Sequence, residues 1–227
     1  MITDERFSSY MNSLYAENTS FLQKLEEEAH RDDVPIIRKE TQQLLKVLLS
    51  SKQPSAILEV GAAIGFSSIL MAEYNPVPCK ITTIENYDKR IPIAKKNIKE
   101  GNKSDVITLL EGDATEILKE LDGPYDFIFM DAAKAQYIVF LPEVKRLLSP
   151  GGMLISDNVL QDGDVVQSRF AVTRRNRTIH KRMREYLYAL THDEELMTTI
   201  LPVGDGVTIS IKKEISDEKV RVIGSGQ

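Results

Sequence analysis

The chain has 227 residues, of which 42% are hydrophobic and 28% are charged, with a formal net charge of −5 at pH 7. This composition is that of an ordinary globular protein, and it excludes disordered, collagen-like and disulfide-rich chains. Cys79 is the only cysteine, so an intramolecular disulfide and a cysteine-based zinc cluster are excluded. The sequence has neither a signal-peptide pattern nor an apolar run of membrane-spanning length, so we expect a cytoplasmic protein that does not engage a membrane.

Residues 1–50 carry apolar side chains at helical spacing, which predicts a helical extension packed on the core. Val34-Pro35-Ile36-Ile37 interrupts this pattern, because proline disfavours helix in the residue before it. From residue 51 to residue 213, short apolar runs alternate with amphipathic segments, which is typical of a parallel sheet covered by helices. We expect the polar residues 214–227 to form a tail.

The alternation predicts an α/β fold with a doubly wound, mostly parallel sheet of seven strands. The strands are expected at residues 56–60, 80–85, 106–111, 127–131, 153–157, 197–203 and 207–212. Helices are expected between them, near residues 67–73, 89–100, 114–121 and 137–148. The last two strands are joined by Gly204-Asp205-Gly206, a turn sequence that suits an antiparallel hairpin.

Residues 57–68, with the sequence ILEVGAAIGFSS, lead from the first strand through a tight turn into a helix. Gly61 and Gly65 allow the backbone to turn sharply and to approach a ligand. Ser67 and Ser68 lie where the amides and hydroxyls of a helix start bind polar groups. Because the spacing lacks the third glycine of the dinucleotide motif, it favours a smaller and less anionic cofactor.

Acidic residues follow the second and third strands at the same predicted edge of the sheet. Glu85 lies about twenty residues after the glycine turn, where a carboxylate can accept both hydroxyls of a ribose. Asp113 follows the third strand and could meet an adenine amino group. Each residue alone could equally be a helix cap or a solvated charge. Together they point to the crevice in which open α/β sheets bind ligands.

Oxygen-bearing side chains also end the next two strands, with Asp131 at the end of the fourth and Asp157-Asn158 at the end of the fifth. Adjacent parallel strands lie about 4.8 Å apart, so the three side chains can meet at one point. Oxygen donors without sulfur or imidazole suit Mg²⁺, Mn²⁺ or Ca²⁺. The alternative is that Asp157-Asn158 only turns the chain and that Asp131 caps a helix.

Lys134 lies one helical turn after Asp131. A neighbouring cation would disfavour its ammonium form, so Lys134 is a candidate general base for the proton of an acceptor hydroxyl. The alternative is a solvated surface lysine. His180 and His192 lie on polar stretches away from the strand ends, and we do not expect either to act as a base.

At these residues the sequence resembles the cation-dependent O-methyltransferases of the catechol and caffeoyl-CoA type, over roughly residues 34–212. The resemblance is carried, in family order, by Glu59-Val60-Gly61, Gly65-Phe66-Ser67, Asp131, Lys134, Tyr137 and Asp157-Asn158. It implies the class I fold of S-adenosylmethionine-dependent methyltransferases, a divalent cation such as Mg²⁺, and a homodimer. It implies metal ligands at Asp131, Asp157 and Asn158 and catalytic roles for Asp131 and Lys134. The implied cofactor contacts are Arg38 or its neighbour Ile37, Glu59, Gly61, Ser67, Ser68, Glu85, Asp113 and Asp131.

Within this family the chain is most similar to the bacterial branch that methylates 5-hydroxyuridine at the anticodon wobble position of tRNA. Seven Lys or Arg residues and no acidic residue lie between Arg169 and Arg184. Such a local basic segment in an acidic protein suits nucleic-acid phosphates. The candidate RNA-binding residues are Arg38, Lys39, Arg174, Arg175, Arg177, Lys181 and Arg182.

Two other hypotheses remain open at this point. In the first, the basic segment is a solvated helix face or a lid, and the acceptor is a catechol-like small molecule, which also offers two adjacent oxygens to one cation. In the second, more distant hypothesis, the chain is a non-catalytic RNA-binding module that retains the cofactor fold.

Overall fold

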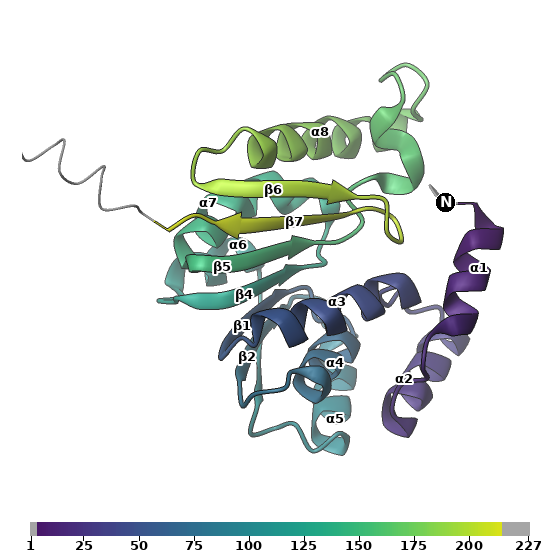
Figure 1. Cartoon of the computed structure of the whole chain (residues 1–227), viewed down its shortest axis with the longest axis vertical. Coiled ribbons are helices and arrows are strands. Elements are labelled where there is room, and N and C mark those ends of the chain that lie inside the picture. The colour runs from purple at the N-terminus through teal and green to yellow at the C-terminus, as the bar shows by residue number, and fades with distance from the viewer. Residues whose placement is uncertain (1–3, 215–227) are drawn as a thin grey trace, which may run out of the picture.

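The computed structural model describes residues 4–214, and Figure 1 shows their arrangement around a single sheet. Seven strands lie in the order β3-β2-β1-β4-β5-β7-β6. Their bounds are β1 (Ala56–Val60), β2 (Lys80–Glu85), β3 (Ile107–Glu111), β4 (Tyr125–Met130), β5 (Leu148–Ser156), β6 (Leu196–Leu201) and β7 (Val207–Lys212). Strands β1 to β5 are parallel, and β7 is antiparallel to both β5 and β6. The predicted doubly wound sheet with a terminal antiparallel hairpin is therefore confirmed.

Helices cover both faces of this sheet (Figure 1). The longer helices are α1 (Glu5–Leu14), α2 (Ser20–Arg31), α3 (Lys39–Lys52), α4 (Phe66–Tyr74), α5 (Ile91–Glu100), α6 (Ala114–Glu120), α7 (Tyr137–Leu147) and α8 (Arg177–Thr191). Three short 3-10 helices are η1 (Lys134–Gln136), η2 (Gln161–Val166) and η3 (Arg174–Asn176). Within residues 4–214, no helix is both long enough and apolar enough to cross a membrane.

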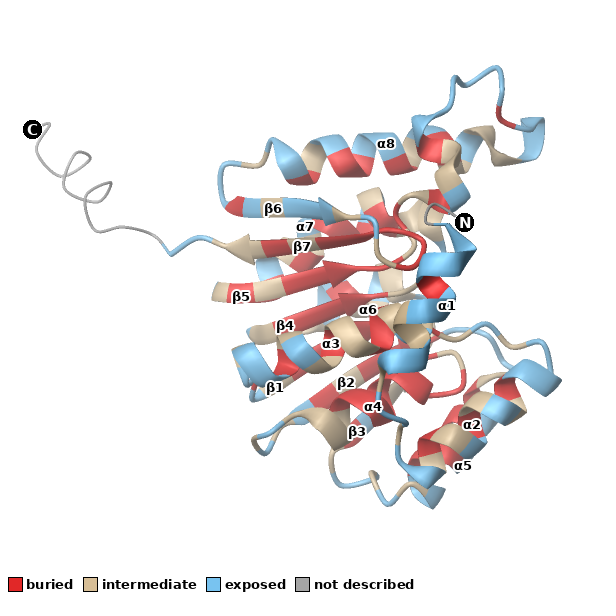
Figure 2. Ribbon diagram, turned by 45° about the vertical axis from the view of Figure 1, so that its right-hand side comes forward, coloured by how far each residue is buried: buried red, intermediate tan, exposed pale blue. Residues whose placement is uncertain are grey.

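The core forms two layers because successive strand side chains point to opposite faces of the sheet. Leu58 of β1 lies in the layer formed with α6, α7 and α8. Its neighbour Ile57 lies in the layer formed with α2, α3, α4 and α5. Figure 2 shows the central strands as buried along most of their length. Strands buried on both faces explain the nearly continuous apolar runs in the sequence.

The N-terminal helices belong to the second of these layers. Leu22 of α2 and both Leu45 and Leu49 of α3 are fully buried in it. Helix α3 begins at Lys39, directly after the proline-containing interruption, and ends at Lys52. The start of α3 lies beside the carboxyl ends of the strands, because the Thr41 hydroxyl donates to Asp157 Oδ1 at 3.5 Å. Of the expected polar tail, residues 215–227 lie outside the described residues, as do residues 1–3.

Helix α8 was not among the predicted elements. Its buried side chains recur at helical spacing, and they are His180, Met183, Tyr186, Leu187 and Leu190. This spacing was available in the sequence but is interspersed with basic residues. Although His180 belongs to a stretch of polar residues, its ring is buried and its Nε2 atom lies 3.2 Å from the Gln167 carbonyl oxygen.

Two strand ends also differ from the prediction. Strand β4 ends at Met130 and β5 ends at Ser156, so Asp131 and Asp157 are the first residues after these strands instead of the last residues in them. Strand β5 begins at Leu148, earlier than predicted, because the chain already pairs with Tyr125 of β4 there. The two aspartates leave the sheet at the same edge.

Candidate active site

The turn after β1 is pressed against the end of β4. Gly61 has a φ of +103°, and a Cβ atom there would lie 2.2 Å from the Asp131 carbonyl oxygen. Only glycine allows this approach. The amides of Gly61 and Ala62 both donate to the Ile84 carbonyl oxygen at 3.0 Å, which ties the turn to β2 as well. The turn backbone therefore has one fixed position at the carboxyl edge of the sheet.

Glu85, the last residue of β2, is held by three backbone amides. Its Oε2 atom accepts from Ala63 at 2.7 Å, and its Oε1 atom accepts from Asn86 at 3.0 Å and Tyr87 at 2.9 Å. A carboxylate has about four acceptor sites, so about one remains for a hydrogen bond from a ligand. This fixed carboxylate suits a ribose hydroxyl.

A cavity of about 670 Å³ extends along the carboxyl ends of the strands. Its size is that of a typical small-molecule or cofactor site. The cavity brings together eight of the predicted residues, which are Arg38, Gly61, Glu85, Asp113, Asp131, Lys134, Asp157 and Asn158. Asp113 also caps α6, because its Oδ1 atom accepts from the Thr115 amide at 2.7 Å.

Three other predicted cofactor contacts, Glu59, Ser67 and Ser68, lie behind the glycine turn and do not line the cavity. The Thr83 hydroxyl donates to Glu59, and Ser68 donates to the Gly65 carbonyl oxygen at 3.1 Å. Burial raises the pKa of Glu59 to about 7, against the opposing effect of neighbouring hydroxyls. These side chains form a buried polar cluster beneath the turn, and their direct contact with a cofactor stays a prediction.

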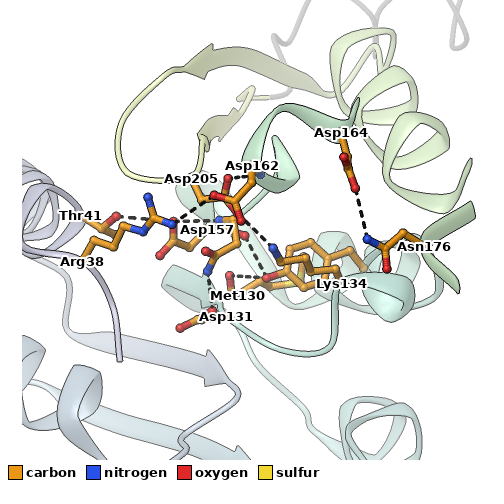
Figure 3. Close-up of polar contacts among 12 residues, drawn as sticks. Arg38, Thr41, Met130, Asp131, Lys134, Asp157, Asp162, Asp164, Asn176 and Asp205 are labelled. Atoms are coloured by element: carbon orange, nitrogen blue, oxygen red, sulfur yellow. Dashed lines mark hydrogen bonds and ion pairs between the residues drawn. The ribbon is translucent and has the colours of Figure 1, made fainter. Parts of the chain in front are cut away.

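Asp131, Asp157 and Asn158 lie together where β4 and β5 end, as predicted from the strand ends, and Figure 3 shows the two aspartates close to each other. The Asn158 side-chain amide donates to Asp131 Oδ1 at 3.1 Å, and the Asn158 backbone amide donates to Asp157 Oδ1 at 2.8 Å. Burial raises the pKa of Asp131, although Asn158 and nearby positive charges oppose this shift. Burial, and then the negative charge of Asp131, raise the pKa of Asp157. A half-buried carboxylate, Asp131, thus lies near a buried one, Asp157, and the neighbouring positive charges do not fully offset their repulsion.

This donor set fits a hard divalent cation. Among residues 4–214, no three His, Cys, Asp or Glu side chains are grouped to hold a metal ion, and Asn158 would add an amide oxygen to the two carboxylates of Asp131 and Asp157. Asn158 has a φ of +59°, a conformation that asparagine tolerates better than most residues. Oxygen ligands suit Mg²⁺, Mn²⁺ and Ca²⁺, and a cation would relieve the repulsion between the two carboxylates.

Lys134 lies in the cavity wall on η1 and is paired with a residue that the sequence analysis missed. Its Nζ atom donates to Asp205 Oδ2 at 3.1 Å (Figure 3). The Lys134 side chain is 29% exposed and the Asp205 side chain only 2%. Lys134 is therefore held by a buried carboxylate instead of being solvated at the surface. Asp205 had been interpreted only as part of the hairpin turn.

Comparison with known proteins identifies the family. An O-methyltransferase family model matches residues 12–213. The chain belongs to the O-methyltransferase family. A catechol O-methyltransferase of Niastella koreensis is 35% identical over 126 residues, which span 54% of this chain and 57% of that protein. A caffeoyl-CoA O-methyltransferase of Eucalyptus gunnii is 32% identical over 184 residues, which span 77% of this chain and 72% of that protein.

Solved structures agree with this O-methyltransferase assignment. A Staphylococcus aureus structure assigned to the caffeoyl-CoA O-methyltransferases has a TM-score of 0.85 and 34% identity, covering 92% of this chain and 100% of that one. An SAH-bound methyltransferase of Podospora anserina has a TM-score of 0.84 and 25% identity, covering 92% and 95% of the two chains. The predicted family and the class I methyltransferase fold are confirmed.

The basic residues of this O-methyltransferase fall into two groups. Some bind within the chain: Arg38 pairs with Asp162 at 3.3 Å, Arg177 donates to the Val172 carbonyl oxygen at 3.4 Å, and Arg182 donates to the Ala135 carbonyl oxygen at 3.0 Å. The others, Lys39, Arg174, Arg175 and Lys181, are exposed, and Lys181 pairs with Glu185 at 3.6 Å. Arg182 thus ties α8 to the segment that carries Lys134. RNA binding by any of these residues stays a prediction.

Proposed function

We propose that this O-methyltransferase transfers the methyl group of S-adenosylmethionine to the 5-hydroxyl of 5-hydroxyuridine in tRNA, with the help of a divalent cation. The product is 5-methoxyuridine at the anticodon wobble position. The observation that carries the proposal is the cavity that joins the fixed Glu85 carboxylate at one end to Asp131, Lys134 and Asp157 at the other. One cavity thus offers a cofactor end and a reacting end.

S-adenosylmethionine would supply the sulfonium methyl group, and Asp131, Asp157 and Asn158 would hold a cation whose charge would favour the deprotonated form of the acceptor hydroxyl. Glu85 suits a ribose hydroxyl of the cofactor, and the Gly61 turn allows close approach of its backbone to the ligand. Lys134 is the candidate base for the hydroxyl proton. Orienting donor and acceptor in one cavity favours in-line attack.

The RNA acceptor is supported by the position of the basic segment. Arg174 and Arg175 are exposed on η3, directly before α8, and α8 packs against the η1 segment that carries Lys134. Arg38 lines the cavity itself. Positive charge beside the reacting end can hold the phosphates of an RNA loop, while a single unstacked base enters the cavity.

A catechol-like acceptor is the second candidate, and the observation that favours it is the similarity to proteins named catechol and caffeoyl-CoA O-methyltransferase. Both acceptors present adjacent oxygens to the same donor set. The two hypotheses therefore differ in what the basic segment does and agree on the chemistry of the reacting end.

Methyl transfer from labelled S-adenosylmethionine distinguishes the acceptors. The enzyme is incubated with Mg²⁺ and either tRNA containing 5-hydroxyuridine or a catechol, and labelled product is counted. We expect label in tRNA, its loss on chelation with EDTA, and its recovery when Mg²⁺ is added back. Turnover of catechol with none on tRNA would overturn the RNA acceptor. Turnover that survives chelation would overturn the metal site.

A further inference from the structure

We propose that Asp205 is a positioning residue that holds Lys134 in its working orientation. This inference rests on the proposed role of Lys134 as the base. The Gly204-Asp205-Gly206 sequence first indicated only a hairpin turn, but the structure brings this turn to the reacting end of the cavity (Figure 3).

The Asp205 carboxylate connects two segments of the site. Its Oδ2 atom accepts from Lys134 Nζ at 3.1 Å, and its Oδ1 atom accepts from the Asp162 backbone amide. Both carboxylate oxygens are therefore engaged in a buried place. A surface ion pair would have little directional effect, but a buried pair with a second hydrogen bond fixes its partner.

The two glycines explain why Asp205 has one position. A Cβ atom on Gly204 would lie 2.9 Å from Thr41 Oγ1, and one on Gly206 would lie 2.3 Å from Leu160 Cγ. Both glycines also have positive φ, of +58° and +87°. The turn is thus inserted between α3 and the loop after β5, where the Leu160 amide donates to the Asp205 carbonyl oxygen at 2.9 Å.

In many enzymes a neighbouring side chain orients the catalytic base, and here Asp205 would orient Lys134 in this way. A lysine side chain has several rotatable bonds, so a free Nζ atom would spend much of its time away from the acceptor. When Lys134 takes the hydroxyl proton, the acceptor O–H bond breaks, an N–H bond forms and an ammonium results. The Asp205 carboxylate orients the amine and lies beside the positive charge that forms.

A double-mutant cycle tests the coupling. Misplacing a reacting group by about 1 Å can lower a rate about a hundredfold, so we expect Asp205→Asn to lower kcat about ten- to a hundredfold with an unchanged KM for S-adenosylmethionine. In a Lys134→Ala background the same change should have no further effect on kcat. Losses that multiply in the double variant would overturn the proposal, because Asp205 would then act independently of Lys134.

Asp193→Asn is the matched control. Asp193 pairs with Lys145 at 2.5 Å, and their side chains are 16% and 20% exposed. This change also removes a Lys–Asp pair but should leave kcat unchanged, and an equal loss of kcat would indicate a general effect of removing an ion pair. Where Asp205→Asn does not fold, Asp205→Glu keeps the charge and displaces it. We expect Asp205→Glu to have a lower kcat than the wild type, because its carboxylate is displaced. A kcat equal to that of the wild type would overturn the proposal.

A measurement without turnover separates this inference from the proposed function. Nitrogen-15 NMR of lysine side chains detects Nζ groups that are held in hydrogen bonds, and Lys134→Arg assigns the Lys134 signal. Asp205→Asn should shift or remove that signal and leave the Lys145 signal in place. Asp193→Asn should shift the Lys145 signal, although Glu195 still lies 3.2 Å from Lys145 Nζ, and leave the Lys134 signal in place. An unchanged Lys134 signal would overturn the pairing. A wild-type enzyme inactive on both acceptors would count only against the proposed function.

Discussion

Glu59 is fully buried beneath the glycine turn, and burial raises its pKa from 4.5 to about 7. Below pH 4.5 Glu59 is protonated in both the folded and the unfolded state, so the contribution of the neutral Glu59 carboxyl to the free energy of unfolding is fully present. As the pH rises toward 7, the unfolded state loses this proton while the folded state keeps it. The contribution is therefore lost over this interval and stays lost at higher pH.

Glu59→Gln should remove this dependence on pH. Between pH 4.5 and pH 7, the free energy of unfolding of the wild type should fall, relative to the variant, by roughly 3 kcal/mol. Urea denaturation of the protein without cofactor at several pH values measures this difference. The exposed Glu111→Gln is the control and should run parallel to the wild type. Parallel curves for Glu59→Gln would show that the buried carboxyl titrates normally.

The residues that could be predicted from the sequence share one geometric property. Glu85, Asp131 and Asp157 end or directly follow parallel strands, and parallel strands all leave the sheet at the same edge. Asp205 instead precedes its strand, and its place depends on the non-local pairing of β7 with β5. A local pattern reveals the hairpin but not the strand beside which the hairpin lies.

At the scale of elements, α8 and the segment before it combine packing with exposed charge. Figure 2 shows that α8 is buried on one side and exposed on the other, whereas most of the preceding loop is exposed. The helix was missed in the sequence because its buried residues alternate with basic ones. Helix α8 supports η1 through Arg182, while Arg174 and Arg175 are exposed on η3, directly before α8.

Charge reversal at this element tests its role in tRNA binding. Arg174→Glu with Arg175→Glu should raise the KM for tRNA at least tenfold and lower the salt dependence of binding by about two phosphate contacts. Binding of S-adenosylmethionine, measured by calorimetry, should not change. Lys96→Glu with Lys99→Glu, on the exposed side of α5, is the control with the same change in charge. If both double variants methylate tRNA equally well, the basic segment is only a solvated surface.

At the scale of the whole molecule, α1 exposes an apolar stripe. Phe7, Tyr10 and Leu14 are 63%, 65% and 65% exposed. Beside them, α1, α3 and the β6–β7 turn enclose an apolar groove of about 310 Å³. Apolar residues that gather on one surface often mark an interface, and a twofold interface uses the same surface on both subunits. We propose that the homodimer expected from the family resemblance forms through this surface.

Light scattering after gel filtration tests this arrangement. The wild type should elute as a dimer at micromolar concentration, and Tyr10→Glu with Leu14→Glu should convert it to a monomer, because charge would be buried in the interface. Tyr188→Glu changes an equally exposed aromatic residue on α8 and should leave the dimer intact. A monomeric wild type would contradict the expectation.

Of the described strands, β7 comes last in the sequence, yet it lies inside the sheet between β5 and β6. The glycine turn and the carboxylate trio follow strands that come earlier in the sequence, whereas residues 204–212 come after them. Only the docking of β7 brings a partner to Lys134. A chain without residues 204–212 would leave this amine without its Asp205 partner, so the reacting end of the site depends on a strand from the far end of the described chain.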